Sequence, residues 1–197
     1  HSIESIDSTQ LAVIAMGKCG ARELNYLSDV DVIYVASGEA EDYLEVATKL
    51  ATKLAKNIDE PSTEPGLWQV DPNLRPEGKQ GALVRSLDAH IGYYQRWAES
   101  WEFQALLKAR FIAGDEELGA SYIAAIKPLI WSKPDRSSIV ESARHLRKRV
   151  LELIPAEHRE LEIKLGRGGL RDVEFTAQLM QLVHGTTDES LRVMSTF

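Results

Sequence analysis

The sequence predicts an α+β fold, in which a small mixed sheet with associated helices is followed by a helical bundle. The continuous apolar run 11–16 is typical of a buried strand, and residues 29–36 form a second apolar strand pattern that carries two aspartates. From Leu87 onward the apolar residues recur at helical spacing. We therefore expect a mixed domain over residues 1–114 and a helical domain over residues 115–197.

The first half of the chain alternates expected strands and helices. The helix at 42–57 is the best defined, because its leucines and alanines fall on one face at helical spacing. The loop that follows it is dense in Pro, Glu and Ser. The expected elements are strands at 11–16, 29–36, 67–71 and 82–85, and helices at 17–26 and 42–57.

The second half is predicted to be almost entirely helical. Asp115 stands where an N-cap residue is expected, directly before an apolar helical pattern. The expected helices are 87–99 and 101–111, as one long helix or two abutting ones, then 116–130, 138–153 and 170–184, with a short strand at 162–165.

Composition places the chain among ordinary globular proteins. It has 197 residues, 44% of them hydrophobic, and a net charge of −7, which disfavours non-specific nucleic-acid binding. No apolar run approaches the roughly 20 residues of a membrane helix. The single cysteine, Cys19, excludes an intrachain disulfide and fits a cytoplasmic protein. Because the chain begins with His1 rather than Met, we expect a fragment of a larger protein.

Asp29 and Asp31 form the central candidate site. Residues two apart on a strand share one face, so the two carboxylates project together. Within an apolar strand such groups are costly to bury without partners. Mg²⁺ prefers oxygen ligands of this kind, together with substrate phosphates. The alternative is that the pair is solvated or caps a helix.

Asp71 ends the next predicted strand and supplies a third carboxylate. Three carboxylates at one sheet edge are able to hold two Mg²⁺ ions for chemistry at phosphorus. The cations that follow, Arg75, Lys79 and Arg85, suit phosphate groups. For Arg75 a structural pairing with Asp71 or Glu77 is an equal alternative.

The turn that contains Gly17, Lys18 and Gly20 is the candidate phosphate cradle. Glycine lets the backbone approach a phosphate closely, and lysine adds a positive charge. Cys19 lies inside this turn. It is either a reactive thiol or a small packed residue, and we favour the packed residue.

The spacing of the glycine turn and Asp29-Val30-Asp31 resembles the pattern of polymerase beta-like nucleotidyltransferases, although that pattern expects Gly-Ser or Gly-Gly in the turn. Four blocks in the same order resemble the bacterial glutamine synthetase adenylyltransferase/adenylyl-removing enzymes. These blocks are MGKCGARELNYLSDVDVIYV, VDPNLRPEGKQGALV, AESWEFQALLKARFIAGD and IKLGRGGLRDVEFTAQLMQLVHG.

The resemblance implies one of the family's two nucleotidyltransferase units, each of which is followed by a helical bundle. The last block is more similar to the adenylyl-removing unit. This unit removes AMP from a tyrosine of glutamine synthetase with phosphate as the attacking group and ADP as the product. The alternatives are AMP transfer from ATP to the same tyrosine, and a non-catalytic module that docks signalling proteins of the PII type.

The same resemblance implies roles for the candidate residues. Asp29 and Asp31 are expected to bind Mg²⁺, Asp71 to be the third ligand or a base, and the turn from Gly17 to Gly20 to hold phosphate. The expected partners are glutamine synthetase, phosphate and ADP or ATP, with PII protein reached through the larger enzyme. No membrane or nucleic-acid partner is expected.

Overall fold

The computed structural model describes residues 3–60, 65–132, 136–152, 154–158 and 161–196. The chain divides into two compact units: His1–Ala98 with Lys108–Leu129, and Glu99–Leu107 with Ile130–Phe197. These units interleave along the sequence. The expected division into domains at 1–114 and 115–197 stays a prediction.

A five-stranded mixed sheet forms the centre of the first unit, as predicted. Strand β2 is antiparallel to β1 on one side and parallel to both β3 and β4 on the other, while β1 pairs antiparallel with β5. The strands are β1 (Gln10–Ala15), β2 (Val30–Ser37), β3 (Val70–Asp71), β4 (Val84–Ser86) and β5 (Arg110–Gly114).

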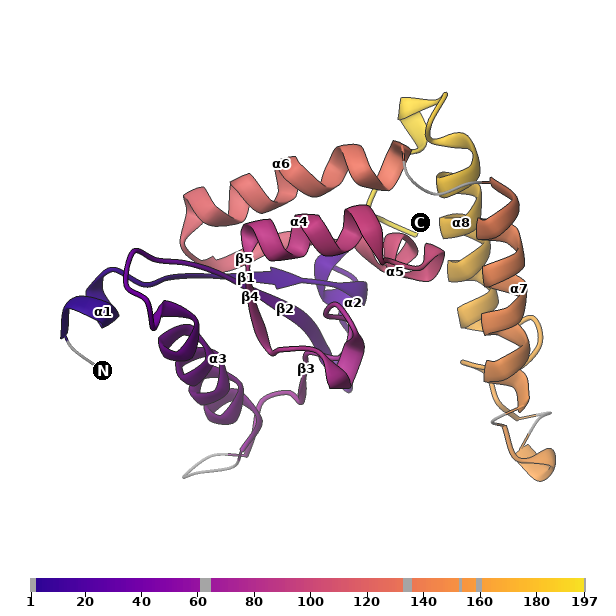
Figure 1. The fold of residues 1–197 in the computed structure, drawn as a ribbon. Helices are drawn as coiled ribbons and strands as arrows, with labels where there is room; N and C mark the ends of the chain where they lie inside the picture. The colour runs from indigo at the N-terminus through magenta and orange to yellow at the C-terminus, as the bar shows by residue number, and fades with distance from the viewer. Residues whose placement is uncertain (1–2, 61–64, 133–135, 153, 159–160, 197) are drawn as a thin grey trace. The chain divides into compact units, whose positions relative to one another are not determined.

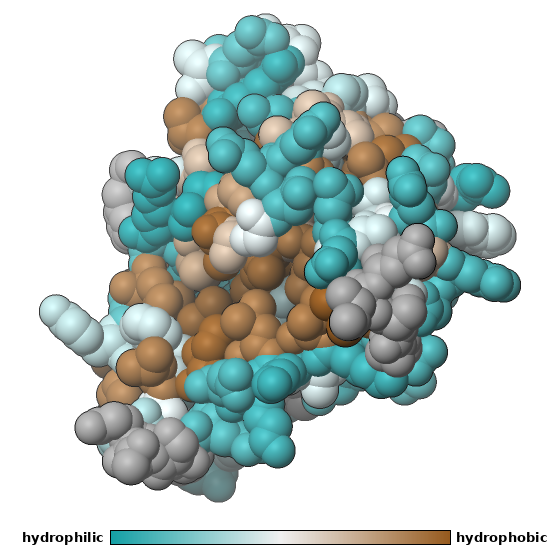
Figure 2. All heavy atoms as spheres, turned by 90° about the vertical axis from the view of Figure 1, so that its left-hand side faces the viewer, coloured by the Kyte–Doolittle hydropathy of each residue, from teal (hydrophilic) through white to brown (hydrophobic). Residues whose placement is uncertain are grey.

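Helix α3 (Tyr43–Asp59) covers one face of this sheet. Its small residues Ala47 and Ala51 are fully buried in one cluster with Val13, Val32 and Tyr34. Small residues let the helix approach the strands closely, so the apolar side chains of the strands fill the interface. Farther out, leucines of α3 are partly exposed, and Figure 2 shows apolar surface in the middle of the face on which α1 (Ile3–Asp7) and α3 lie.

Helices α4 (Leu87–Arg96) and α6 (Glu116–Ser132) lie on the opposite side of the sheet from α3 (Figure 1). The ring of buried His90 on α4 meets the Tyr122 ring of α6 edge to face, with 5.3 Å between centroids. Gly119 lies directly against the Phe111 ring of β5, where a side chain would collide. The predicted N-cap of α6 is confirmed, because Asp115 accepts a hydrogen bond of 2.8 Å from the Leu118 amide.

Three predicted elements are wrong, and the strand predicted at 67–71 is shortened to β3 (Val70–Asp71). Helix α2 (Gly17–Gly20) does not continue to residue 26, because Arg22 adopts a left-handed φ of 63°. The predicted helix at 101–111 ends early, and strand β5 follows it. Residues 162–165 form a turn, in which the Glu162 side chain accepts hydrogen bonds from the amides of Lys164 and Leu165.

The second unit contains α5 (Ser100–Leu106), α7 (Arg136–Glu152) and α8 (Leu170–His184), which contact one another. A buried hydrogen bond of 2.7 Å joins Gln104 of α5 to Gln178 of α8. Arg147 of α7 ion-pairs with Asp172 of α8 and donates to the carbonyls of Leu165 and Gly166. Three single-turn 3₁₀ helices complete the elements of the chain as described: Gly78–Gln80, Ala156–His158 and Glu189–Leu191.

Among the helices of the described ranges, none combines the length and the apolar composition that crossing a bilayer requires.

His90 predicts a pH dependence of stability. Burial lowers its pKa from 6.5 to about 4, while its Nε2 donates to the Tyr34 carbonyl at 3.3 Å. Between about pH 4 and pH 6.5, the His90 imidazole is mostly protonated in the unfolded chain and mostly neutral in the folded chain. Stability from this group is therefore complete above pH 6.5 and falls as the pH drops toward 4.

We expect the free energy of unfolding to fall by about 2 kcal/mol from about pH 7.5 to about pH 5 through this residue alone. Urea titrations at both pH values measure it. In the His90→Phe variant the pH-dependent loss should shrink by that amount, and an unchanged loss would contradict the assignment.

Candidate functional site

The register of two parallel strands brings the three predicted carboxylates together. Asp31 of β2 pairs with Asp71 of β3, so neighbouring strands present their carboxylates side by side. Asp29 precedes Asp31 by two residues and shares its face. One carboxylate oxygen from each of the three lies within 4.8 Å of the others.

Backbone hydrogen bonds fix this end of the sheet. The Val30 amide donates to the Gln69 carbonyl at 2.8 Å, and the Met16 amide donates to the Asp31 carbonyl at 2.9 Å. The Asp71 carboxylate accepts a hydrogen bond of 2.7 Å from the Asn73 amide, which orients it. The backbone positions of Asp31 and Asp71 are therefore fixed by the pairing of the strands.

Gly17 touches the cluster. Its φ is +50°, in the region that favours glycine, and a Cβ at this position would lie 2.5 Å from Oδ2 of Asp31. A side chain here would displace the carboxylate. Of the expected phosphate cradle, the structure therefore places Gly17 directly beside the carboxylates, with half-buried Lys18 next in the chain.

Two cations from one sequence block hold the turn that begins at Gly17. Arg110 donates from Nε to the Gly20 carbonyl and from Nη2 to the Cys19 carbonyl, both at 2.8 Å. The Lys108 ammonium, whose side chain is only 4% exposed, donates to Glu23 at 3.2 Å. Gly20 itself packs against the Lys108 carbonyl, which leaves no room for a Cβ.

The sequence places these two cations on the helix predicted at 101–111 and favours packing and surface charge for them, with a functional role as the alternative. The signal that marks them is the Lys108-Ala109-Arg110 block, which the resemblance included. The missing information was strand β5, because only its pairing with β1 places Arg110 beside Ala15 and under the glycine turn.

Cys19 behaves as a packed residue. Burial raises the pKa of the Cys19 thiol. The positive charge of Arg110 lowers this pKa, but by less than burial raises it, and the negative charge of Asp31 raises it further. A raised pKa lowers the thiolate fraction at neutral pH, and the thiolate is the reactive form. This supports the structural alternative over the reactive thiol.

The predicted phosphate-binding arginines hold a loop. Arg75 donates to the carbonyls of Pro72 and Gly81 at 3.0 Å and to that of Lys79 at 3.2 Å. Glu77 ion-pairs with Arg85, not with Arg75. Lys79 is exposed on the same loop. The structure thus gives Arg75 a loop-closing role, and phosphate binding by Arg75, Lys79 or Arg85 stays a prediction.

Arg85 also lies over the Tyr93 ring, with 5.6 Å from Cζ to the centroid. Together the two arginines hold the segment directly after Asp71 in one conformation. That segment also contains Asn73, whose amide orients the Asp71 carboxylate. The arginines therefore contact the loop that follows Asp71.

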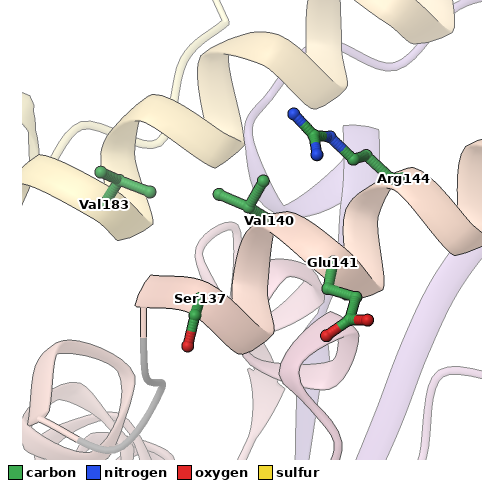
Figure 3. Close-up of a pocket in the computed structure, with 5 residues that line it drawn as sticks. All are labelled: Ser137, Val140, Glu141, Arg144 and Val183. Atoms are coloured by element: carbon green, nitrogen blue, oxygen red, sulfur yellow. The ribbon is translucent and has the colours of Figure 1, made fainter.

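A groove of about 660 Å³ lies in the second unit, between α7 and Val183 of α8 (Figure 3). Its lining from α7 combines apolar Val140 with the charged Glu141 and Arg144. None of the sequence-predicted site residues lines it.

The donor set of the carboxylate cluster fits a divalent cation. Three hard oxygen ligands converge, and Gly17 places no side chain against them. Paired carboxylates without a cation repel one another, and a cation removes that repulsion. The residues that would hold Mg²⁺ are Asp29, Asp31 and Asp71.

Comparisons with known proteins agree with this geometry. The sequence model of the family described as glutamate-ammonia ligase adenylyltransferase matches residues 2–125, more than half of the chain. That of GlnD PII-uridylyltransferase matches residues 142–196.

Similar proteins include bifunctional glutamine synthetase adenylyltransferase/adenylyl-removing enzymes of three bacteria. That of Leifsonia xyli subsp. xyli is 56% identical over 97% of this chain and 20% of its own length. Those of Mycolicibacterium smegmatis and Streptomyces coelicolor are 56% and 54% identical, over 95% and 92% of this chain and 19% of their own length. The chain thus spans about a fifth of the length of these relatives.

The buried ion pair under the turn gives a stability prediction. Lys108→Met should lower the free energy of unfolding by about 2 kcal/mol, because the mostly buried Glu23 carboxylate loses its ion pair with Lys108. Adding Glu23→Gln should restore part of the loss. Urea unfolding of the two single variants and the double variant measures the coupling.

Lys49→Met is the matched control, since its pair with Glu45 is 63% exposed on both sides and should contribute less than about 0.5 kcal/mol. Equal losses of unfolding free energy for Lys108→Met and Lys49→Met would show that the Lys108–Glu23 pair stabilises the fold no more than an exposed pair does.

Proposed function

Because the chain belongs to the glutamate-ammonia ligase adenylyltransferase family, we propose that it removes AMP from an adenylylated tyrosine of glutamine synthetase by phosphorolysis and releases ADP. The observation that carries the proposal is the convergence of Asp29, Asp31 and Asp71 within 4.8 Å beside Gly17. The choice of AMP removal rests on the block that contains Gly166–Gly169, which resembles the adenylyl-removing unit.

The carboxylates would hold Mg²⁺ at the edge of the sheet. A bound Mg²⁺ neutralises charge that develops on phosphate oxygens and helps to align the attacking and leaving groups. Positioning and charge neutralisation supply most of the acceleration in phosphoryl-type transfer. The rigid strand register therefore serves the reaction directly, because it holds the ligand oxygens before substrate arrives.

The glycine turn would admit the substrate phosphate. Gly17 has no side chain between the backbone and the carboxylate cluster, and Lys18 adds a positive charge in the same turn. Arg110 holds the carbonyls at the end of this turn, so its path is fixed. These residues bind and orient; none of them needs to exchange a proton.

The direction of the reaction determines whether a base is needed. In the removing direction phosphate attacks the α-phosphorus of the adenylylated tyrosine, the P–O bond to the phenolic oxygen breaks, and the phenolate leaves with its electron pair. Phosphate is already an anion at neutral pH. In the adding direction a phenol with a pKa of about 10 must lose its proton, and Asp71 would be the base.

Two alternatives follow from the relatives. Their names include both adenylyl transfer and adenylyl removal, so transfer from ATP to the same tyrosine is the rival activity. The match of residues 142–196 to the GlnD PII-uridylyltransferase family supports a connection with PII signalling, and with it the regulatory-module alternative. In either case we place the chain in the cytoplasm with its protein substrate.

The test mixes the chain with adenylylated glutamine synthetase, Mg²⁺ and phosphate, and measures ADP. We expect phosphate-dependent ADP formation that Asp29→Asn abolishes, because a carboxylate ligand is lost without a change of shape. Asp88→Asn makes the same change at an exposed position on α4 and should leave the rate unchanged. Incorporation of AMP from ATP into unmodified glutamine synthetase, without phosphorolysis, would establish the rival activity instead.

A further inference from the structure

Four large apolar side chains are exposed in the two segments that lead into strands β2 and β3. Tyr26 and Leu27 are 101% and 99% exposed, and Leu67 and Trp68 are 70% and 41% exposed. We call these four residues the apolar rim. Single exposed apolar residues are ordinary on protein surfaces, but the location of these four sets them apart.

Both parts of the apolar rim lead into the strands that carry the carboxylates. Leu27 precedes Asp29 by two residues, and Trp68 precedes Asp71 by three. Because β2 and β3 are parallel and pair Val30 with Val70, their leading segments enter the sheet at the same end. The hydrogen bond from the Val30 amide to the Gln69 carbonyl holds the two segments next to each other there.

Exposure of such side chains to water has a free-energy cost. Burial of a leucine side chain stabilises a fold or a complex, and the aromatic rings bury still larger areas. The segments that carry the apolar rim leave this stabilisation unused within the first unit. Tyrosine and tryptophan are also enriched at protein–protein interfaces.

The exposure of the apolar rim fits a protein surface better than a small molecule. Sites for small ligands are concave and bury most of the ligand. The side chains of Tyr26 and Leu27 are instead exposed over their whole length, so they project from the chain. A projecting pair of this kind can insert into a depression on a folded partner.

We propose that the apolar rim docks the folded protein substrate, by contacting an apolar surface that flanks the modified tyrosine. This inference rests on the proposed function, which requires a protein tyrosine to reach the carboxylates. In this proposal the carboxylates and the glycine turn bind the phosphate, which is common to every nucleotide. The apolar rim supplies the recognition of the protein that carries it.

The test compares two double variants with the unchanged chain: Tyr26→Ser with Leu27→Ser, and Leu67→Ser with Trp68→Ser. Binding of adenylylated glutamine synthetase is measured directly, for example by biolayer interferometry, and so does not depend on turnover. We expect each double variant to raise the Kd at least tenfold. The Kd values for Mn²⁺ and for AMP should stay within twofold, since neither ligand touches the apolar rim.

Leu44→Ser is the matched control. Leu44 is a partly exposed leucine at the start of α3, beyond the opposite end of β2, and its replacement should leave the Kd for glutamine synthetase unchanged. Thermal unfolding of each variant confirms that the exposed positions leave the fold intact.

Unchanged binding of the protein substrate in both double variants would overturn the docking role. Equal losses for AMP and for the protein would also overturn it, since the apolar rim would then contact the nucleotide. Tight binding that the double variants weaken, but without phosphate-dependent ADP release by the unchanged chain, would refute the proposed function and leave the docking role in place.

Discussion

Electrostatic repulsion among three carboxylates is the constraint on which the candidate site depends. Oxygens of Asp29, Asp31 and Asp71 lie within 4.8 Å of one another. Two unit charges about 4 Å apart repel by roughly 1 kcal/mol in water and roughly 4 kcal/mol near a protein surface. The sheet holds the groups together despite this repulsion, because the parallel pairing of β2 with β3 fixes Asp31 beside Asp71. A cation converts this unfavourable arrangement into a binding site.

The rest of the first unit keeps that edge of the sheet in place. Gly17 allows the turn after β1 to pass against Asp31, and Arg110 holds the carbonyls of the same turn from strand β5. On the other side of the cluster, Arg75 closes the loop that follows Asp71 through three backbone carbonyls. Backbone hydrogen bonds from these two arginines therefore hold the turn and the loop that flank the carboxylates.

Local sequence patterns predicted the core strands, helix α3 and the convergence of the carboxylates, because the two-residue period of a strand and the spacing of apolar residues are local properties. They failed at β5. In the sequence its residues continue a helical pattern, and they form a strand because they pair with β1, about 100 residues earlier. Local patterns could not foresee that Arg75 contacts three backbone carbonyls of its loop and that Arg85 pairs with Glu77, since these contacts depend on how the loop closes. The helix at 17–26 was overpredicted for a related reason: Arg110, distant in sequence, takes the carbonyls that a longer helix would use.

The central claim is that strand register assembles a divalent-cation site from Asp29, Asp31 and Asp71. Anomalous X-ray diffraction from crystals of the chain grown with Mn²⁺ tests it most directly, because Mn²⁺ scatters anomalously and takes the oxygen ligands that Mg²⁺ prefers. We expect an anomalous peak at about 2.2 Å from oxygens of all three residues, with Asp31 still paired with Asp71. A peak elsewhere, or none at this edge of the sheet at saturating Mn²⁺, would contradict it.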